Sequence, residues 1–178
     1  MRLFHLPVLI PVILVLCVGC ASEYPEGMPK LYKAQLTLCY DDGTPIEGAS
    51  VVFQTEDAQK TGTWVHSAIT DANGTGKLMT QGKYDGLPAG KYSVTLAKYI
   101  LEGVPPPRMP NNAEEQKAYD DYYKSGETQQ RFFVIASEYS SVASTPLKSI
   151  EILPKNGQKL SLNAGEPVKV RQELPKVR

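Results

Sequence analysis

Hydrophobic and polar residues alternate in several short stretches of the chain, which is the period of a β-strand with one buried face. The clearest case is 34–40, where Ala34, Leu36, Leu38 and Tyr40 alternate with Lys33, Gln35, Thr37 and Cys39. Extended or alternating patterns recur at 49–53, 64–70, 76–81, 92–99, 132–136, 149–153 and 159–163. The strands recur every 8–15 residues with turn residues between them, which predicts an all-β chain folded as an antiparallel two-sheet sandwich.

The last two of these stretches are joined by a strong turn signal. Residues 154–157 read Pro-Lys-Asn-Gly, and Asn-Gly is the pair that favours a tight two-residue hairpin. We therefore expect 149–153 and 159–163 to be connected by a hairpin turn.

Residues 102–131 break the alternating pattern. Prolines at 105–107 and 110 exclude a central strand, because proline has no amide proton to donate to a sheet. Asn112 followed three residues later by Glu115 resembles a helix-capping box, so we expect a helix over 113–124. This segment is predicted to be a short helical insertion in the sandwich.

Three tyrosines of this insertion, Tyr119, Tyr122 and Tyr123, stand at helical spacing. The expected arrangement packs their rings on the sandwich. The alternative is an aromatic binding ledge, because tyrosine offers a large, rigid and amphipathic contact surface. Together with Trp64, these three residues are the candidate ligand-binding residues.

The N-terminus carries an export signal. After Arg2, an apolar run of 13 residues extends from Leu6 to Val18, which is typical of a signal peptide and shorter than the roughly 20 residues of a membrane-spanning helix. The following Val18-Gly19-Cys20 resembles a bacterial lipobox, although Cys17 stands where that motif usually has leucine.

The lipobox resemblance implies that the Cys20 thiol receives a diacylglycerol, that residues 1–19 are removed, and that the new amine is acylated. Membrane attachment through Cys20, with palmitate as a typical acyl group, would place the protein in the cell envelope. Ala21-Ser22 follow Cys20 without an adjacent aspartate, which by resemblance to known sorting patterns favours the outer membrane or the cell surface.

Charge and cysteine content narrow the function classes. The chain has 19 Lys+Arg and 19 Asp+Glu residues, so its net charge is zero and becomes −1 once Arg2 is removed. Nucleic-acid binding requires a cationic excess, so no nucleic-acid partner is expected. With Cys17 removed and Cys20 acylated, Cys39 has no partner for an intramolecular disulfide.

These patterns divide the chain into four parts: signal peptide 1–19, tether 20–32, sandwich 33–163 with the insertion at about 102–131, and C-terminal tail 164–178. The end of the chain from residue 166 is charged and interrupted by proline, so we expect a loose tail there.

Five ordered motifs carry a second resemblance: DDGTPIEGASVVF, AITDANGTGKL, YDGLPAGKYSV, YSSVASTPLKSIEI and NGQKLSLN. Together they resemble the carboxypeptidase regulatory-like, or transthyretin-like, domains, in the form found in surface lipoproteins of the planctomycete kind. The resemblance covers about residues 34–163 without the insertion. It implies a seven-stranded, antiparallel, two-sheet prealbumin-like sandwich with Greek-key connections.

Enzymes with related sandwiches need residues that this chain lacks. Hydroxyisourate hydrolases resemble transthyretin but use several histidines and a Tyr-Arg-Gly-Ser ending, and intradiol dioxygenases bind iron through two histidines. After removal of the signal peptide the chain keeps only His66, which we expect to be a packed or surface strand residue. Residues 71–74 resemble the start of a calcium loop without its later glutamate. No catalytic residue, metal or cofactor is expected.

The sequence thus predicts a non-enzymatic, lipid-anchored protein that displays one transthyretin-like binding or structural domain, with an envelope protein or a glycan as the expected partner. The first alternative is a module that binds carbohydrate or a small ligand through Tyr119, Tyr122, Tyr123 and Trp64. The second is an unrecognised hydrolase, suggested only by enzymes of the same superfold.

Overall fold

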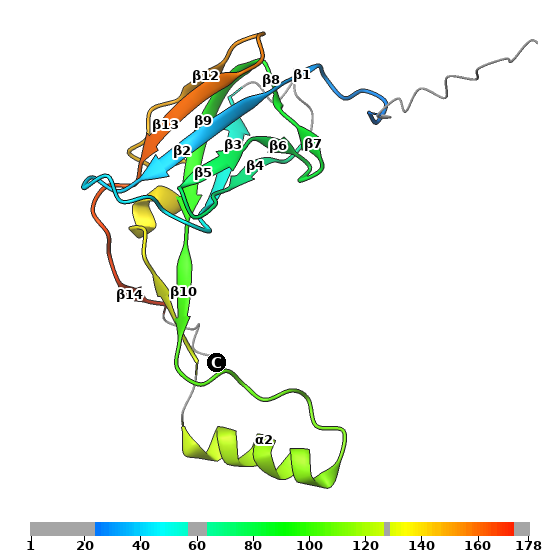
Figure 1. Ribbon diagram of the computed structural model, residues 1–178, viewed down its shortest axis with the longest axis vertical. Helices are drawn as coiled ribbons and strands as arrows, with labels where there is room; N and C mark the ends of the chain where they lie inside the picture. The colour runs from blue at the N-terminus through cyan, green and yellow to red at the C-terminus, as the bar shows by residue number, and fades with distance from the viewer. Residues whose placement is uncertain (1–23, 57–63, 127–128, 173–178) are drawn as a thin grey trace, which may run out of the picture.

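The computed structural model describes residues 24–56, 64–126 and 129–172 (Figure 1). Strands make up most of its regular structure, and the sheets are largely antiparallel. Within the described residues there is a single α-helix, α2 (Ala113–Ser125). No helix in this part of the chain is long and apolar enough to cross a membrane. The predicted all-β class is confirmed.

The larger sheet has six strands in the order β12-β9-β3-β4-β6-β7, and every neighbouring pair is antiparallel. These strands are β3 (Ser50–Thr55), β4 (His66–Ile69), β6 (Met79–Thr80), β7 (Tyr84–Asp85), β9 (Gly90–Ala97) and β12 (Ile150–Ile152). β3 and β9 are rich in β-branched and aromatic residues, which fit a pleated, half-buried surface. β9 pairs with β3 over residues 92–97 and with β12 over residues 90–92.

The smaller sheet has three strands in the order β13-β2-β5. They are β2 (Ala34–Cys39), β5 (Thr75–Lys77) and β13 (Gln158–Asn163). β5 is antiparallel to β2, but β13 runs parallel to it over six residue pairs from Gln158↔Ala34 to Asn163↔Cys39. The prediction of a wholly antiparallel sandwich is wrong for this pair.

The predicted Asn-Gly hairpin is also wrong, because β12 and β13 belong to different sheets. Ile152 and Leu162 are both buried in one core, and their strands separate to reach that core from opposite sides. The loop between them is tied to the start of β2. The Gly157 amide donates to the Lys33 carbonyl at 2.8 Å, and the Lys33 amide donates to Asn156 Oδ1 at 2.9 Å.

The two sheets face each other and share one hydrophobic core (Figure 1). Inward-pointing residues alternate with outward-pointing ones along β2, as the sequence pattern predicted. The buried side chains of the facing strands are Ala34, Leu36, Leu38, Val51, Phe53, Ala68, Tyr92, Val94, Leu96, Ile152 and Leu162. The Tyr92 ring meets Phe53 edge-on at 6.3 Å and its hydroxyl donates to the Pro88 carbonyl at 2.9 Å. Burial raises the pKa of Tyr92.

Short elements close the ends of this two-sheet body. β1 (Leu31–Tyr32) pairs with β8 (Leu87–Pro88) at one end. At the other end lies the 3-10 helix η1 (Ser137–Ser140), whose Tyr139 side chain is buried in the shared core. Residue 165 favours glycine, because its φ of 69° is left-handed and a Cβ would lie 2.8 Å from the Tyr139 hydroxyl oxygen, which would have to move.

A three-stranded arm leaves the body beside η1 (Figure 1). It consists of β10 (Tyr99–Glu102), β11 (Gln130–Phe133) and β14 (Val170–Arg171), with β11 in the middle and antiparallel to both neighbours. The expectation of a loose tail from residue 166 is therefore wrong up to residue 172. Hydrogen bonds from the Val168 amide to the Val134 carbonyl and from the Gln172 amide to the Arg131 carbonyl extend this pairing.

His66 on β4 is a packed core residue that is 1% exposed. Its Nδ1 lies 3.0 Å from the Thr80 Oγ1, and the Thr80 hydroxyl donates to the Gly86 carbonyl at 2.8 Å. Since the hydroxyl has one proton, Nδ1 must be the protonated donor and Nε2 the bare nitrogen. Nε2 is buried without a hydrogen-bond partner, and burial lowers the pKa of His66.

This arrangement predicts acid sensitivity of the fold. The folded pKa of His66 lies below the value of 6.5 that applies to the unfolded chain, so the unfolded state binds more protons below that pH. The free energy of unfolding should therefore fall as the pH is lowered through 6.5, by at most about 1.4 kcal/mol per pH unit. Urea unfolding at a series of pH values measures it.

His66→Gln is the matched variant, because glutamine can still donate to Thr80 but does not titrate. At neutral pH the unfolding free energy of this variant should be lower than that of the wild type. Between about pH 6.5 and about pH 5 it should change less with pH than that of the wild type. An equal slope in the wild type and this variant would assign the acid sensitivity to other groups.

Candidate functional site

The arm is a direct continuation of the core. β9 ends at Ala97 and β10 begins at Tyr99, so only Lys98 separates the core strand from the arm. At the base, the Val134 amide donates to the Lys98 carbonyl at 3.2 Å and the Tyr40 hydroxyl donates to the Val134 carbonyl at 3.0 Å. The body thereby fixes the direction in which the arm leaves.

Paired cationic and aromatic side chains cover the arm. The Arg131 guanidinium lies 4.3 Å from the centre of the Tyr99 ring, and Lys169 Nζ lies 4.9 Å from the centre of the Phe132 ring. Lys169 also forms a 2.7 Å ion pair with Glu102. Both partners of that pair are about half exposed, so it contributes little stability. The arm is held mainly by its backbone ladder and by these cation–π contacts.

Helix α2 begins as the capping signal predicted. The Asn112 side chain accepts from the Glu115 amide at 2.8 Å, but the Glu115 carboxylate accepts from Asn111 and not from Asn112. The forward half of the predicted box is confirmed, and the return contact lies one residue earlier. The helix ends at Gly126, whose φ of 71° is the left-handed conformation that glycine adopts readily.

The expectation that this helix packs its tyrosines on the sandwich is wrong. None of the residues of α2 is buried, and the helix lies beyond the tip of the arm, away from the two sheets (Figure 1). The physical reason is the β10–β11 pairing, which extends the chain outward before the helix begins.

The three tyrosines instead contact one another. The ring centres of Tyr119 and Tyr123 are 4.7 Å apart, and Tyr122 meets Tyr123 edge-on at 5.1 Å. A hydrogen bond with Tyr119 raises the pKa of Tyr123. Tyr123 is 53% exposed, so its ring is the part of the cluster most open to a ligand.

Tyr122 has a structural role within the arm. Its hydroxyl donates to the Val104 carbonyl at 2.8 Å and accepts from the Gln129 amide at 3.3 Å. These bonds connect the segments before and after the helix. A hollow of about 250 Å³ between this loop and α2 is lined by Pro107, Arg108, Asn111, Glu115 and Ala118.

The structure does not bring Trp64 into this cluster. Trp64 lies two residues before β4 in the body, whereas the tyrosines lie on α2 at the end of the arm (Figure 1). Cys20, the predicted lipidation site, lies outside the described residues. The helical spacing of Tyr119, Tyr122 and Tyr123 did identify side chains that meet in space.

Sequence reasoning missed a set of exposed apolar residues on the arm and its loop. They are Tyr99, Leu101, Val104, Met109 and Val170. The available signal was the apolar run 99–101, which follows β9 after Lys98 alone and precedes the three prolines at 105–107. An apolar run that continues past the end of a core strand but cannot stay in the sheet indicates an extension with a surface of its own.

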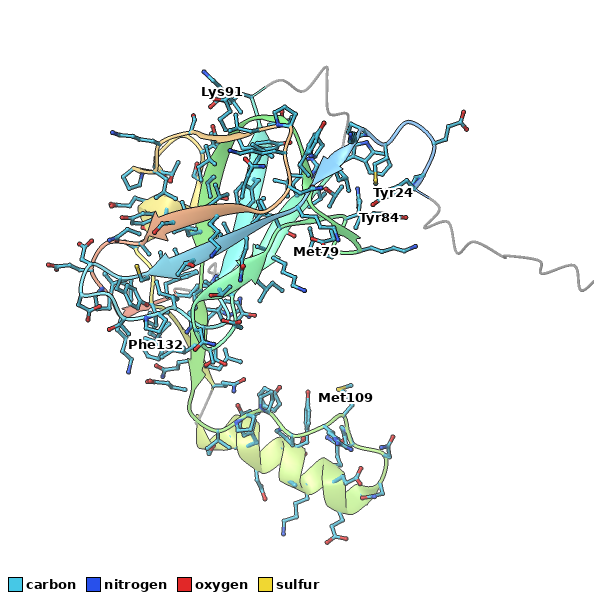
Figure 2. The ribbon with its side chains drawn as sticks, turned by 45° about the horizontal axis from the view of Figure 1, so that its top comes forward. Tyr24, Met79, Tyr84, Lys91, Met109 and Phe132 are labelled. Carbon is cyan, nitrogen blue, oxygen red and sulfur yellow. The ribbon has the colours of Figure 1, made fainter. Side chains whose placement is uncertain are left out.

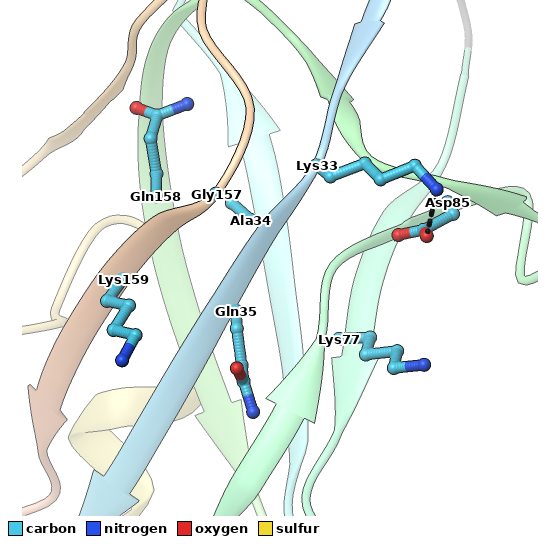
Figure 3. A pocket seen from close by; sticks show the side chains of 8 residues that line it. All are labelled: Lys33, Ala34, Gln35, Lys77, Asp85, Gly157, Gln158 and Lys159. Carbon is cyan, nitrogen blue, oxygen red and sulfur yellow. Dashed lines mark ion pairs between the residues drawn. The ribbon is translucent and has the colours of Figure 1, made fainter.

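A second hollow, of about 260 Å³, lies on the outer face of the smaller sheet (Figure 3). Lys77 and Lys159 are the registered neighbours of Gln35 on the flanking strands, and Lys33 forms a 3.1 Å ion pair with Asp85. Lysine side chains thus outnumber carboxylates here, and Lys77 and Lys159 are exposed to solvent. This face is compatible with an anion and offers no fixed set of polar groups to orient one.

The histidine and the cysteine of the described residues belong to no metal-binding group. Their only histidine, His66, is hydrogen-bonded to Thr80 and meets the Tyr92 ring edge-on at 5.6 Å, and the Cys39 thiol lies 3.8 Å from the Leu162 carbonyl. No three His, Cys, Asp or Glu side chains in this part of the chain gather into a group that could hold a metal ion. The exposed rings and apolar side chains of the arm and α2 are suited to non-covalent contact with another molecule.

Comparisons of the chain with family models, with curated proteins and with solved structures gave no match.

The double role of the Tyr122 hydroxyl leads to a prediction. Tyr122→Phe keeps the ring but removes both hydrogen bonds, so the loop 103–111 should open more readily from α2, by about 1 kcal/mol per lost bond. Amide hydrogen exchange should become faster in 103–111 and 129–130 and stay unchanged in β3 and β9. Tyr123→Phe, which leaves these two bonds in place, is the control.

Proposed function

We propose that this chain is a lipid-anchored envelope protein that uses a non-catalytic transthyretin-like domain to hold a binding element away from the membrane. The lipobox-like Val18-Gly19-Cys20 supports the anchor. The arm and α2 are the binding element. An envelope protein is the proposed partner, at the outer membrane or the cell surface.

The transthyretin-like assignment is part of this proposal. Two facing sheets around one core, built from the five motifs in their sequence order, support it. The parallel β2–β13 pair and the short strands β5, β6 and β7 are departures from a simple seven-stranded antiparallel sandwich.

One observation carries the functional proposal: the helix lies at the opposite end of the long axis from the first described residue. Figure 1 shows β1 near the top of the body and α2 at the bottom. If Cys20 is held in the membrane, the helix is the part of the described chain that extends furthest from the anchored end. A helix without a buried residue, carried on a structured arm, is suited to contact another molecule.

Protein is favoured over carbohydrate by the shape of the tyrosine cluster. A sugar-stacking platform needs an open ring face, but Tyr119 and Tyr122 both lie against Tyr123. The exposed apolar residues Leu101, Val104 and Met109 add a surface that a protein partner can bury. The alternative, a carbohydrate- or small-ligand-binding module, relies on the exposed part of Tyr123.

The anchor is tested by Cys20→Ser in cells fed a palmitate analogue. We expect the wild type to be labelled and to sediment with membranes, and the variant to be unlabelled and released. Cys39→Ser is the matched control and should keep both label and membrane location. Labelling that persists in Cys20→Ser rejects Cys20 as the anchor.

The binding element is tested by cross-linking on intact cells with Leu101→Ser/Tyr123→Ser. Loss of two exposed contact residues should lower the recovery of a specific cross-linked protein at least about tenfold. Lys77→Gln/Lys159→Gln, on the outer face of the smaller sheet, should leave the recovery unchanged.

A partner that is cross-linked equally by the wild type and by both double variants contradicts the assignment of partner binding to the arm. The same variants on a glycan array test the alternative. Glycan binding that requires Tyr123 would favour it, and glycan binding that survives the substitution would reject it.

A further inference from the structure

The end of the body nearest to Cys20 carries a surface of its own. The described chain begins at Tyr24, only four residues after Cys20, so the two Cα atoms are at most about 14 Å apart. With Cys20 acylated at the membrane interface, as the proposed function requires, the Tyr24 Cα must lie within about 14 Å of it. The chain length therefore limits which end of the body can face the bilayer.

Aromatic rings and a lysine gather at this end (Figure 2). The ring centres of Tyr24 and Tyr84 are 5.4 Å apart, and Lys83 Nζ lies 5.1 Å from the centre of the Tyr84 ring. Tyr24 is 50% exposed, although its ring packs on β7. Nearby in the chain, Lys30 Nζ lies 5.5 Å from the centre of the Tyr32 ring.

The β6–β7 hairpin presents these groups on a tight turn. Gln81 and Gly82 both have positive φ, 55° and 63°, which is the geometry of a type I′ turn. Glutamine tolerates this conformation poorly, so the surrounding structure must hold it. One restraint is the hydrogen bond from the Gln81 amide to the Val65 carbonyl at 2.7 Å. Val65 is 55% exposed and adds an aliphatic side chain beside the turn.

The chemistry of this end matches a lipid headgroup region. Tyrosine and lysine are residues that favour the membrane interface, where the ring or the aliphatic stem contacts the acyl boundary and the polar end stays hydrated. Lys30 and Lys83 face solvent and would be attracted to anionic headgroups, while Glu26 opposes them. Lys33 and Asp85 neutralise each other in their ion pair.

We propose that the surface formed by Tyr24, Lys30, Val65, Lys83 and Tyr84, the anchor-side surface, rests on the headgroup region of the membrane that holds Cys20. The occupant is the bilayer and not a protein, because the short connection to Cys20 leaves little room for one between them. This contact fixes the orientation of the body. The arm and α2 then extend away from the membrane.

Trp64 makes the contact measurable, because it is the single tryptophan of the chain and directly precedes Val65. The mature acylated protein is reconstituted into vesicles of phosphatidylethanolamine and phosphatidylglycerol, with and without brominated acyl chains. We expect brominated lipid to quench Trp64 emission. Lys30→Glu/Lys83→Glu, which changes only exposed side chains, should reduce the quenching while the protein stays on the vesicles.

The matched control is Trp64→Phe/Met109→Trp, which moves the tryptophan to a residue that is 76% exposed at the α2 end. Its emission should not be quenched. Quenching at position 109 but not at position 64 would mean that the α2 end faces the bilayer. Absence of quenching at both positions would mean that neither end contacts the bilayer. Either result overturns the anchor-side surface.

This experiment separates failure of the lipid anchor at Cys20 from failure of the anchor-side surface. A chain that carries no lipid on Cys20 and does not sediment with the vesicles refutes the anchor, and the surface with it. A chain that is acylated and sediments, but whose Trp64 is not quenched, refutes the anchor-side surface and leaves the anchored display function intact.

Discussion

The parallel pairing of β13 with β2 is the constraint on which the rest of the structure depends. It joins segments more than 120 residues apart in sequence, as the bond between Lys33 and Asn156 shows. Such a pairing costs loop-closure entropy, which the burial of Leu36, Leu38 and Leu162 in the shared core offsets. Once β13 is in place, the smaller sheet covers the larger one.

The arm continues the core strand β9. β3 pairs with β9 over residues 92–97, up to the end of the strand, whereas β12 pairs only with its first three residues. The chain leaves as β10 and returns as β11, and the C-terminal segment adds β14 as the third strand. Three strands and their cation–π contacts give the arm a structure of its own, where a two-stranded ribbon would be marginal. Helix α2 is thereby displayed without being packed.

Alternation predicted the strands well, because the period of two is set locally by which side chains face the core. It predicted β2, β3, β9 and β13 to within a few residues. It could not predict that β13 would lie beside β2, because the same alternation suits a hairpin and a parallel pair equally. The tyrosine cluster was predictable from helical spacing. Its position was not, because the spacing of Tyr119 and Tyr123 does not determine whether the helix packs on the two sheets. The contact of Tyr24 with Tyr84 joins residues 60 positions apart, and only the fold brings them together.

The single residue between β9 and β10 has a mechanical consequence. A pull on the arm enters the body along β9, because only Lys98 separates β10 from β9. The hydrogen bonds of β9 to β3 and β12 are perpendicular to the strand, so such a load acts on them together as shear and does not open them one at a time. The junction between the arm and the body therefore resists such a load as one cooperative unit.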